Sequence, residues 1–439
     1  MDALPRRALS LFDATCLIVG IIVGAGVYQV APDVARGAGS AAGVLALWAA
    51  GALLSLCGAL GYAELASAFR DREGGDVVYL GRAYGPWAGF LFGWTQLAVV
   101  RPGDIAVMAF AFATYARALL EPLAAGGSHG PGLLPYAAGA VAVLTALNVA
   151  GVTEAKWAQN LLTVAKVIGL VAIAGLALAT PRAGPAAADV EPLPWTVALI
   201  LVLFSYGGWN EMAYVAAEVK HPRRSIVRAL LLGMAAVAAL YLLLNGALLH
   251  ALGVGGVAAS SAVASDAVSI RLPGTGSRLV AALIAVSALG AVNGLIFTGA
   301  RISYAAGTEH RAFRALGRWN PRTGTPVIAL VVQGAIAIAL IVLLGSFVEA
   351  LLYTAPAVYA FYLATTAAVA VLRRREPGLE RPYRVTLYPL PLVVFGAVCV
   401  FLIQAAATFR PGVTAASGAL VALGLPIFWL TNRHPPGRD

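Results

Sequence analysis

The sequence predicts an all-α membrane protein with twelve transmembrane helices. Of its 439 residues, 60% are hydrophobic and only 11% are charged, whereas soluble domains carry about 25% charged residues. Apolar runs long enough to cross a hydrocarbon core of roughly 30 Å recur from end to end. The longest polar interval covers only residues 305–325, which excludes a large soluble domain.

Each apolar run is assigned to one membrane crossing. The predicted crossings are 11–35, 41–69, 86–120, 133–150, 157–180, 195–218, 226–251, 278–304, 326–345, 347–372, 387–408 and 414–431. The first run follows Arg6 and Arg7 as a secretory signal would, but no suitable cleavage site follows it. We therefore interpret it as a retained first span.

The basic residues predict the orientation. With a cytoplasmic N-terminus, 22 of the 30 Lys and Arg residues face the cytoplasm, six face outward, and Arg101 and Lys166 lie within spans. Cytoplasmic loops of membrane proteins carry this excess. Both termini are thus predicted to be cytoplasmic. The protein itself is predicted to lie in the plasma membrane or bacterial inner membrane. The net charge of +10 then reflects topology and contact with anionic lipid, and nucleic acid is not an expected partner.

The residues that carry most enzyme chemistry are sparse. Cys16, Cys57 and Cys399 lie in apolar segments and are interpreted as core residues. Their spacing, and that of the five His residues, matches no disulfide framework or metal site. No phosphate-binding loop or hydrolytic motif is present. We expect no metal, no cofactor and no enzymatic activity.

Two spans are interrupted by glycine. The first, LIVGIIVGAGVYQVAPDVA (17–35), contains Gly24-Ala25-Gly26, although glycine costs about 1 kcal/mol relative to alanine inside a helix. Close helix packing explains a single such pattern. The sixth span, however, carries Gly207-Gly208 at the corresponding place in the second half of the chain. Paired interruptions are typical of transporters built from inverted repeats.

This pairing predicts a five-plus-five arrangement. The first repeat is residues 1–180 with spans one to five, and the second is residues 181–375 with spans six to ten. Because each repeat has an odd number of spans, the two repeats have opposite orientations. Residues 376–439 supply the last two spans and a cytoplasmic tail.

The interruptions predict a polar site near the bilayer centre, because unwound backbone is tolerated only where it lines a cavity. The outer half of span one begins near Gly26, where free N–H groups suit an anion. Its inner half ends near Ile22, and the outer half of span six ends near Phe204. Their free carbonyls suit a cation. A backbone site with both poles matches an α-amino acid.

Lys166 lies near the middle of span five, roughly 13 Å from its start at 1.5 Å per residue. In one interpretation it extends to the inner surface. In the other, its ammonium points toward the carbonyls near Gly20 and Ile21 and does the work of a sodium ion.

Other polar residues accompany the site. We expect Arg101 and Asp104 to neutralise one another one helical turn apart in a structural pair. Asn210 is placed to orient the unwound segment or to contact ligand, and Glu211 to pair with a cation that the sequence does not identify. Phe204 is placed to cover the ligand from outside.

Two basic inner loops complete the pattern. Glu218 is expected to pair with loop cations. Between spans eight and nine, Arg311, Arg314 and Arg318 fall near one helical face, which suits an interfacial helix on anionic lipid.

At this point the chain resembles the L-amino-acid transporter branch of the amino acid–polyamine–organocation superfamily, and its prokaryotic members in particular. The matching segments run in family order over the first nine spans, and the last three spans match in hydropathy alone. They are GIIVGAGVY (20–28), VVRPGDIAVMAFAFATY (99–115), QNLLTVAKVIGL (159–170), FSYGGWNEMAYVAAEVKHPRRSI (204–226), LGAVNGLIFTGARISYAAGTEH (289–310) and NPRTGTPVIAL (320–330).

The resemblance implies a sodium-symporter-like (LeuT-like) fold and alternating access around spans one and six. It assigns the substrate carboxylate to the amides of Gly24, Ala25 and Gly26. It assigns the ammonium to the carbonyls of Ile22, Phe204 and Gly207. Asn210 matches a position near substrate, Phe204 the outer gate, and Lys166 a lysine associated with sodium independence.

Two departures from the family pattern matter. Gly-Ser-Gly of span one is Gly-Ala-Gly here, so a hydroxyl is lost at Ala25 while the amide remains. The loop after span three, EPLAAGGSHGPG, has no Cys, so no disulfide-linked heavy subunit is expected.

The leading hypothesis is a sodium-independent secondary transporter of L-amino acids that exchanges neutral amino acids. Two alternatives stay open, namely a proton-coupled permease for amino acids or amines, and a non-transporting amino acid sensor on the same fold.

Overall fold

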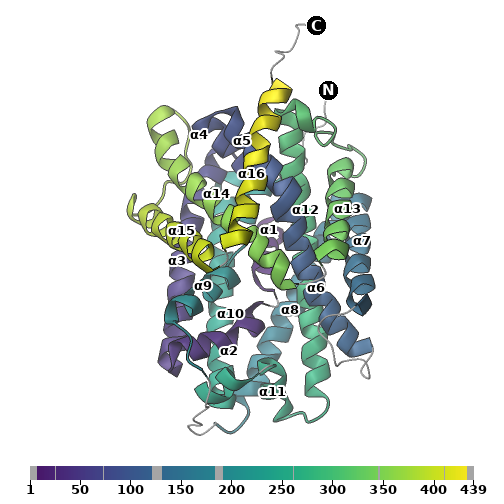
Figure 1. The fold of residues 1–439 in the computed structure, drawn as a ribbon, viewed down its shortest axis with the longest axis vertical. Helices are drawn as coiled ribbons and strands as arrows, with labels where there is room; N and C mark the ends of the chain where they lie inside the picture. The colour runs from purple at the N-terminus through teal and green to yellow at the C-terminus, as the bar shows by residue number, and fades with distance from the viewer. Residues whose placement is uncertain are drawn as a thin grey trace.

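The computed structural model describes residues 7–24, 26–72, 74–120, 131–182, 191–260, 262–344, 347–409 and 411–432. These residues form an elongated bundle of helices, with the first and last described residues at one end, called here the end with the termini (Figure 1). Over the described ranges, β-structure is limited to two isolated bridges, Leu9 to Val219 and Asn320 to Thr325. The all-α prediction is confirmed for this part of the chain.

The first half of the chain contains the following elements. They are α1 (Leu11–Ile22), α2 (Gly26–Ala38), α3 (Ala41–Ala68), α4 (Asp76–Tyr84), α5 (Pro86–Thr95), the π-helix η1 (Gln96–Val100), α6 (Arg101–Leu120), the 3₁₀ turn η3 (Pro131–Leu133), α7 (Leu134–Ala150) and α8 (Val152–Leu178). A capping box starts α1, in which Ser10 Oγ accepts the Asp13 N–H and the Asp13 carboxylate accepts the Ser10 N–H at 2.8 Å.

Like the first half, the second half combines long helices with one interrupted helix. It contains α9 (Trp195–Ser205), the 3₁₀ helix η4 (Trp209–Glu218), α10 (Pro222–Ala259), α11 (Val263–Ser269), α12 (Gly276–Glu309), the 3₁₀ turn η5 (Arg311–Phe313), α13 (Val327–Leu344), α14 (Phe347–Arg375), α15 (Leu390–Phe409) and α16 (Pro411–Asn432). Each predicted span coincides with one of these helices or with a broken pair.

Length and hydropathy qualify six described helices as membrane crossings, and a seventh is obtained if α1 and α2 are taken together. The six are Ala41–Ala68, Pro86–Arg117, Thr153–Leu178, Pro222–Ala259, Gly276–Glu309 and Pro356–Arg375. Four further apolar helices are shorter, namely Leu134–Ala150, Val327–Leu343, Leu390–Ala405 and Ser417–Thr431. The count of twelve crossings therefore stays a prediction.

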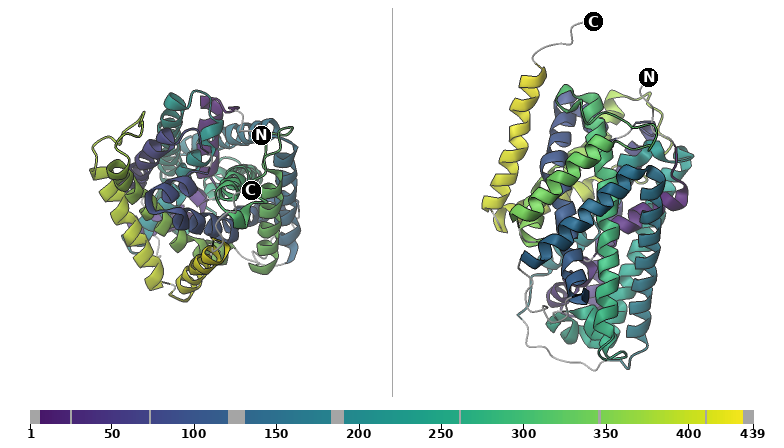
Figure 2. Two further views of the ribbon diagram at one scale, coloured as in Figure 1. Left: turned by 90° about the horizontal axis from the view of Figure 1, so that it is seen from above. Right: turned by 90° about the vertical axis from the view of Figure 1, so that its right-hand side faces the viewer.

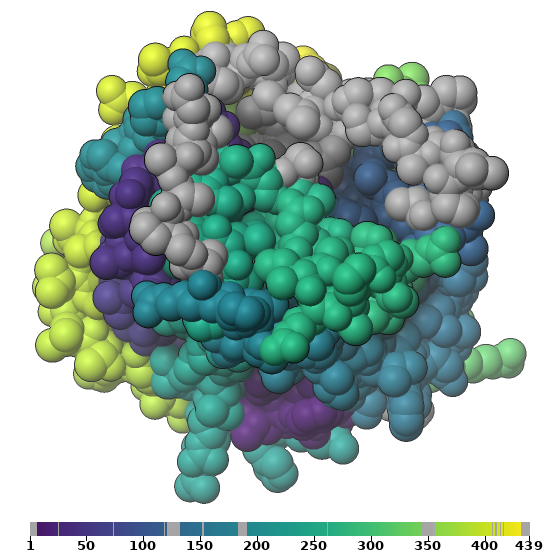
Figure 3. Space-filling view, turned by 90° about the horizontal axis from the view of Figure 1, so that it is seen from below, coloured from purple at the N-terminus to yellow at the C-terminus, as the bar shows by residue number. Residues whose placement is uncertain are grey.

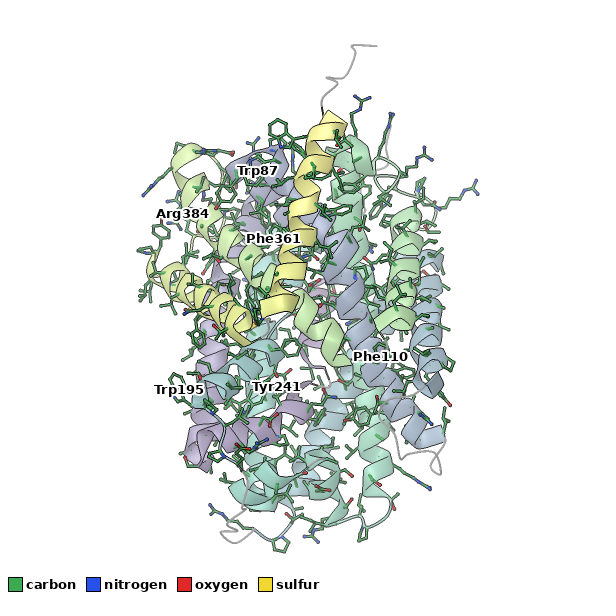
Figure 4. All side chains as sticks on the ribbon, viewed as in Figure 1. Trp87, Phe110, Trp195, Tyr241, Phe361 and Arg384 are labelled. Atoms are coloured by element: carbon green, nitrogen blue, oxygen red, sulfur yellow. The ribbon has the colours of Figure 1, made fainter. Side chains whose placement is uncertain are left out.

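The outer surface of the bundle is apolar while charged side chains lie inside it. Leu53, Val143 and Ile168 are each more than 60% exposed, whereas Lys166 and Arg301 are 2% and 0% exposed. A surface of this kind suits lipid rather than water. Exposed Trp87 lies near the upper end of the bundle in Figure 4, as expected for an aromatic residue at a membrane interface, and exposed Trp195 lies on its side, level with Tyr241.

The helices around the centre position the candidate site. α1 packs against α10, α8 and α12, and α6 packs against α12. α16 packs on α5 and α14 at the outside of the bundle (Figure 2). At the end away from the termini, α11 packs on α12, α10, α8 and α2, and its segment lies over the middle of that face (green in Figure 3).

The expected interfacial helix between α12 and α13 is wrong. After α12 the chain makes only the short turn η5 and further turns, and the bridge between Asn320 and Thr325 follows. The reason is a backbone contact: a Cβ at Gly307 would lie 2.1 Å from the Gly317 amide nitrogen. The segment folds back onto the end of α12, so a helix cannot continue.

Candidate binding site between two interrupted helices

The predicted interruption of the first span is present. α1 ends at Ile22, α2 begins at Gly26, and the two axes differ by 51°. Val23 N–H closes the last helical turn on Val19 O, and Gly24 N–H donates to Ile22 O at 2.9 Å. Ala25, a predicted carboxylate ligand, lies outside the described residues.

Side chains donate hydrogen bonds to the backbone carbonyls at the C-terminal end of α1. Lys166 Nζ donates to Gly20 O and Val23 O, both at 2.6 Å, and Ser287 Oγ donates to Val23 O at 3.0 Å. Lys166 is 2% exposed and does not extend to the surface. The predicted contact with the Gly20 carbonyl is confirmed, and the surface-reaching interpretation of Lys166 is wrong.

The predicted interruption of the sixth span is also present. α9 ends at Ser205, and Gly207 N–H donates to Phe204 O at 2.9 Å. Gly208 then adopts φ 108°, a left-handed conformation that glycine tolerates best, and η4 begins at Trp209. The chain resumes as a 3₁₀ helix, whose tighter winding often marks a functional segment.

One tyrosine joins the two interruptions. The Tyr241 hydroxyl of α10 lies 2.8 Å from Ile22 O and 3.1 Å from Ser205 O, which are the last carbonyls of α1 and α9. Tyr241 is fully buried in the middle of the bundle (Figure 4). Sequence reasoning missed it because a single tyrosine in an apolar helix carries no distinguishing signal.

A cavity of about 140 Å³ lies between the two interruptions. This is several times the ~10–15 Å³ that one water needs. Five predicted site residues line it, namely Ile22, Gly24, Gly26, Phe204 and Gly207. Lys166 and Asn210 are outside its lining. Asn210 accepts a hydrogen bond from the lining residue Tyr362. Lys166 binds the carbonyls of Gly20 and Val23, which are next to lining residues in the chain.

The backbone wall of the cavity has two poles. The first N–H groups of α2 have no partner within their helix, so they suit an anion. On the carbonyl side, Phe204 O accepts the Gly207 N–H at 2.9 Å and is a second acceptor for the Tyr206 N–H, and the neighbouring Gly207 also lines the cavity. Ile22 O already accepts from Gly24 N–H and Tyr241, which leaves it less available than predicted.

The cavity glycines leave space. A Cβ at Gly24 would meet no atom nearer than Met108 Sδ at 3.6 Å, and one at Gly26 none nearer than Ser205 Oγ at 3.7 Å. A Cβ at Gly20, by contrast, would lie 2.2 Å from Gln159 Nε2. Gly20 therefore serves packing, whereas Gly24 and Gly26 keep the site open.

Side chains of α6, α12 and α14 also line the cavity, together with Glu211 of η4. The residues from these three α-helices are Asp104, Val107, Met108, Ala291, Leu295, Thr354, Val358, Tyr359 and Tyr362. Arg101 pairs with Glu211 at 2.9 Å rather than with Asp104 as expected. This pairing identifies the cation partner of Glu211 and leaves Asp104 on the cavity wall, where sequence reasoning had given it a structural role.

Asn210 connects the cavity wall to a buried polar network. Its Nδ2 donates to the Tyr214 hydroxyl at 2.9 Å, and its Oδ1 accepts from the Tyr362 hydroxyl at 2.8 Å. Tyr214 donates in turn to Asp76 Oδ2 at 2.8 Å. Two other hydroxyls, those of Tyr62 and Thr365, also donate to Asp76. Asn210 therefore orients the start of η4 and the Tyr362 side chain.

Glu218 at the end of η4 does not pair with loop cations. Arg301 of α12 donates to both of its carboxylate oxygens, at 2.6 and 3.3 Å, and both residues are buried. The Glu218 carbonyl accepts the Leu9 N–H at 2.9 Å. These contacts tie η4 to α12 and to the segment before α1. No group of three metal-ligating residues occurs among the residues that the structure describes.

Comparison with known proteins places this geometry in a family. The family model for amino acid permeases matches residues 9–430. The b(0,+)-type amino acid transporter 1 of Mus musculus is 31% identical over 92% of this chain and 84% of its own length. The serine/threonine exchanger SteT of Bacillus subtilis is 29% identical over 97% of this chain and 96% of its own length.

A third relative also matches nearly the whole chain. The large neutral amino acids transporter small subunit 2 of Homo sapiens is 30% identical over 97% of this chain and 80% of its own length. The family model covers both broken helix pairs and the cavity between them. The chain belongs to the amino acid permease family, a family of transporters rather than enzymes.

Proposed function

We propose that this protein exchanges L-amino acids across the plasma or inner membrane without sodium, with neutral amino acids among its substrates. Its relatives are amino acid transporters and exchangers, and its apolar helices make it a multi-pass membrane protein. The observation that carries the proposal is the cavity between two helix interruptions, with N–H groups at the start of α2 and carbonyls at the end of α9.

In the proposed binding mode, the substrate carboxylate accepts hydrogen bonds from the amides of Gly24, Ala25 and Gly26. Its ammonium donates to the carbonyls of Phe204 and Gly207. Ile22 O joins them only if Gly24 N–H or Tyr241 releases it. Backbone groups thus bind the part that all α-amino acids share.

Sodium independence is proposed from Lys166. Its ammonium holds two carbonyls at the end of α1, Gly20 O and Val23 O, at 2.6 Å each. Free carbonyls at a helix end are natural ligands for a cation. A covalently attached cation at this place makes a bound sodium ion unnecessary.

The architecture proposed for transport is twelve spans in two inverted repeats, residues 1–180 and 181–375, followed by 376–439. Alternating access then moves the two interrupted spans about the cavity. Phe204, which lines the cavity, is the proposed outer gate. The termini are placed in the cytoplasm, membrane lipid surrounds the bundle, and no disulfide-linked subunit is required.

The test is uptake by the full chain reconstituted in liposomes. Labelled L-serine and L-leucine are added outside vesicles that are empty or preloaded with unlabelled amino acid, in sodium or choline buffer. We expect preloading to raise uptake several-fold and the replacement of sodium to leave it unchanged. Absence of uptake under every gradient overturns the proposal, and a strict sodium requirement overturns the assignment of Lys166.

A proton-coupled permease is the second candidate. It is favoured by two carboxylates beside the site, the buried Asp76 and the partly buried Asp104. In the same vesicles it predicts net uptake into empty liposomes when the outside is acidified. The proton-coupled permease is ruled out if uptake requires amino acid inside the liposomes and does not change with the pH gradient.

A further inference from the structure

The side-chain wall of the cavity carries two carboxylates. Asp104 of α6 and Glu211 of η4 both line it. The residues on either side of Asp104, from Arg101 to Gly103 and from Ile105 to Val107, are buried, while Asp104 itself keeps accessible surface. Its accessible surface therefore faces the cavity that it lines.

One oxygen in this wall is without a partner. Arg101 Nη1 donates to Glu211 Oε1 at 2.9 Å, but Glu211 Oε2 has no hydrogen bond within the described structure, although Glu211 is only 3% exposed. A buried carboxylate oxygen without a donor costs about 1–3 kcal/mol or more. A ligand that brings a donor to this wall recovers that cost.

The charges around the cavity do not cancel. Its wall and the groups next to it contain three carboxylates, of Asp76, Asp104 and Glu211, and two cations, Arg101 and Lys166. Arg101 forms an ion pair with Glu211, and Lys166 donates hydrogen bonds to backbone carbonyls of α1. Asp76 is satisfied by three hydroxyl donors. The Thr354 hydroxyl is the hydrogen-bond partner of Asp104, and the Arg101 guanidinium, which also attracts Asp104, forms its ion pair with Glu211.

We infer that Asp104, with Glu211 Oε2, forms a second subsite that binds the positively charged end of a substrate side chain. The inference rests on the proposed function, because the subsite lines the same cavity as the backbone groups assigned to the α-carboxylate and α-ammonium. It extends the substrates to amino acids such as lysine, whose side chain ends in an ammonium. It disfavours acidic side chains.

The first test needs only the unmodified protein. Uptake of labelled L-serine into preloaded liposomes is competed with lysine, with norleucine, which lacks the terminal ammonium, and with glutamate. Because charged hydrogen bonds in buried sites are strong, we expect lysine to compete at about tenfold lower concentration than norleucine. Norleucine that competes as well as lysine, with serine uptake intact, overturns the subsite and leaves the exchanger standing. Loss of all uptake overturns the exchanger instead.

The second test assigns the subsite to residues. The lysine-to-norleucine ratio is measured within each sample, so differences in overall activity cancel. We expect Asp104→Asn to bring the ratio to about one, and Glu211→Gln to lower it. The matched control is Asp33→Asn, which removes a carboxylate that pairs with Arg36 on α2 away from the cavity. An unchanged ratio in both cavity variants contradicts the assignment.

If Asp104→Asn does not transport, lysine binding is read from thermal stabilisation of the purified protein in detergent. Asp104→Glu keeps the charge and is expected to retain the preference of lysine over norleucine in this assay. Equal stabilisation of the unmodified protein by lysine and norleucine overturns the inference by an independent route.

Discussion

The two helix interruptions look alike in sequence but differ in how their backbone groups are satisfied. At the end of α1, side chains hold three carbonyls: Lys166 binds Gly20 O and Val23 O, and Tyr241 lies on Ile22 O. At the end of α9, Tyr241 reaches Ser205 O alone. The second interruption is shaped instead by its own backbone, through Gly208 and the 3₁₀ helix.

Because of this difference, the two interruptions present different backbone groups to the cavity. Because the α1 carbonyls are already occupied, the first interruption offers mainly the N–H groups at the start of α2. At the second interruption, Phe204 and Gly207 line the cavity, and no side chain of the described residues holds the Phe204 carbonyl. The first thus suits the carboxylate of an amino acid and the second its ammonium. Glycine patterns alone do not distinguish these two roles.

The largest effect is expected where the first interruption depends on a side chain. Lys166→Met removes the charged donor from Gly20 O and Val23 O, each such bond contributing about 1.5–3 kcal/mol. Transport should fall about 100-fold or more, measured as the initial rate of exchange. Lys220→Met, the same change at an exposed lysine outside the helices, is the matched control. Unchanged kinetics in the Lys166 variant make that lysine a bystander.

The next effect concerns the backbone of the second interruption. In Gly208→Ala the new Cβ would lie 2.9 Å from Ile21 Cγ2, at a φ of 108°. Left-handed backbone alone costs a non-glycine residue about 1–2 kcal/mol. We expect a lower melting temperature in detergent and about tenfold slower exchange. Gly246→Ala, where a Cβ meets nothing within 4 Å, should not lose stability. Equal behaviour of the two variants would contradict this explanation.

A smaller effect tests the link between the two interruptions. Tyr241→Phe removes the hydroxyl that lies near Ile22 O and Ser205 O while it keeps the ring. One lost hydrogen bond of about 1 kcal/mol predicts roughly fivefold slower exchange. The variant also frees one lone pair of Ile22 O. If exchange is equally fast in Tyr241→Phe and the unmodified protein, the two helix ends do not depend on this hydroxyl.

The smallest effect on stability is expected at Gly26. An alanine Cβ there would touch Ser205 Oγ at 3.7 Å, an ordinary contact, so the fold should persist. The methyl group occupies cavity space next to the proposed carboxylate site and should raise KM for serine about fivefold. Equilibrium melting and uptake at a series of concentrations separate the two outcomes. A destabilised variant with normal KM would show that Gly26 serves packing.

Sequence predicted the helices and both interruptions because glycine and hydropathy patterns are local. It also predicted that Lys166 meets the α1 carbonyls, since the depth of a lysine in a span follows from its position. It missed the Arg101–Glu211 pair, because partners on different helices depend on packing. The Tyr241 contact and the place of Asp104 on the cavity wall were missed for the same reason.

The most direct test of the central claim asks whether the backbone groups bind both the carboxylate and the ammonium of the substrate. Exchange of labelled leucine is competed with leucine, with 3-methylbutylamine, which lacks the carboxylate, and with 4-methylpentanoic acid, which lacks the ammonium. The account predicts that each analogue competes at least about 100-fold more weakly than leucine, since each leaves one pole unpaired. An analogue that competes as well as leucine would contradict it.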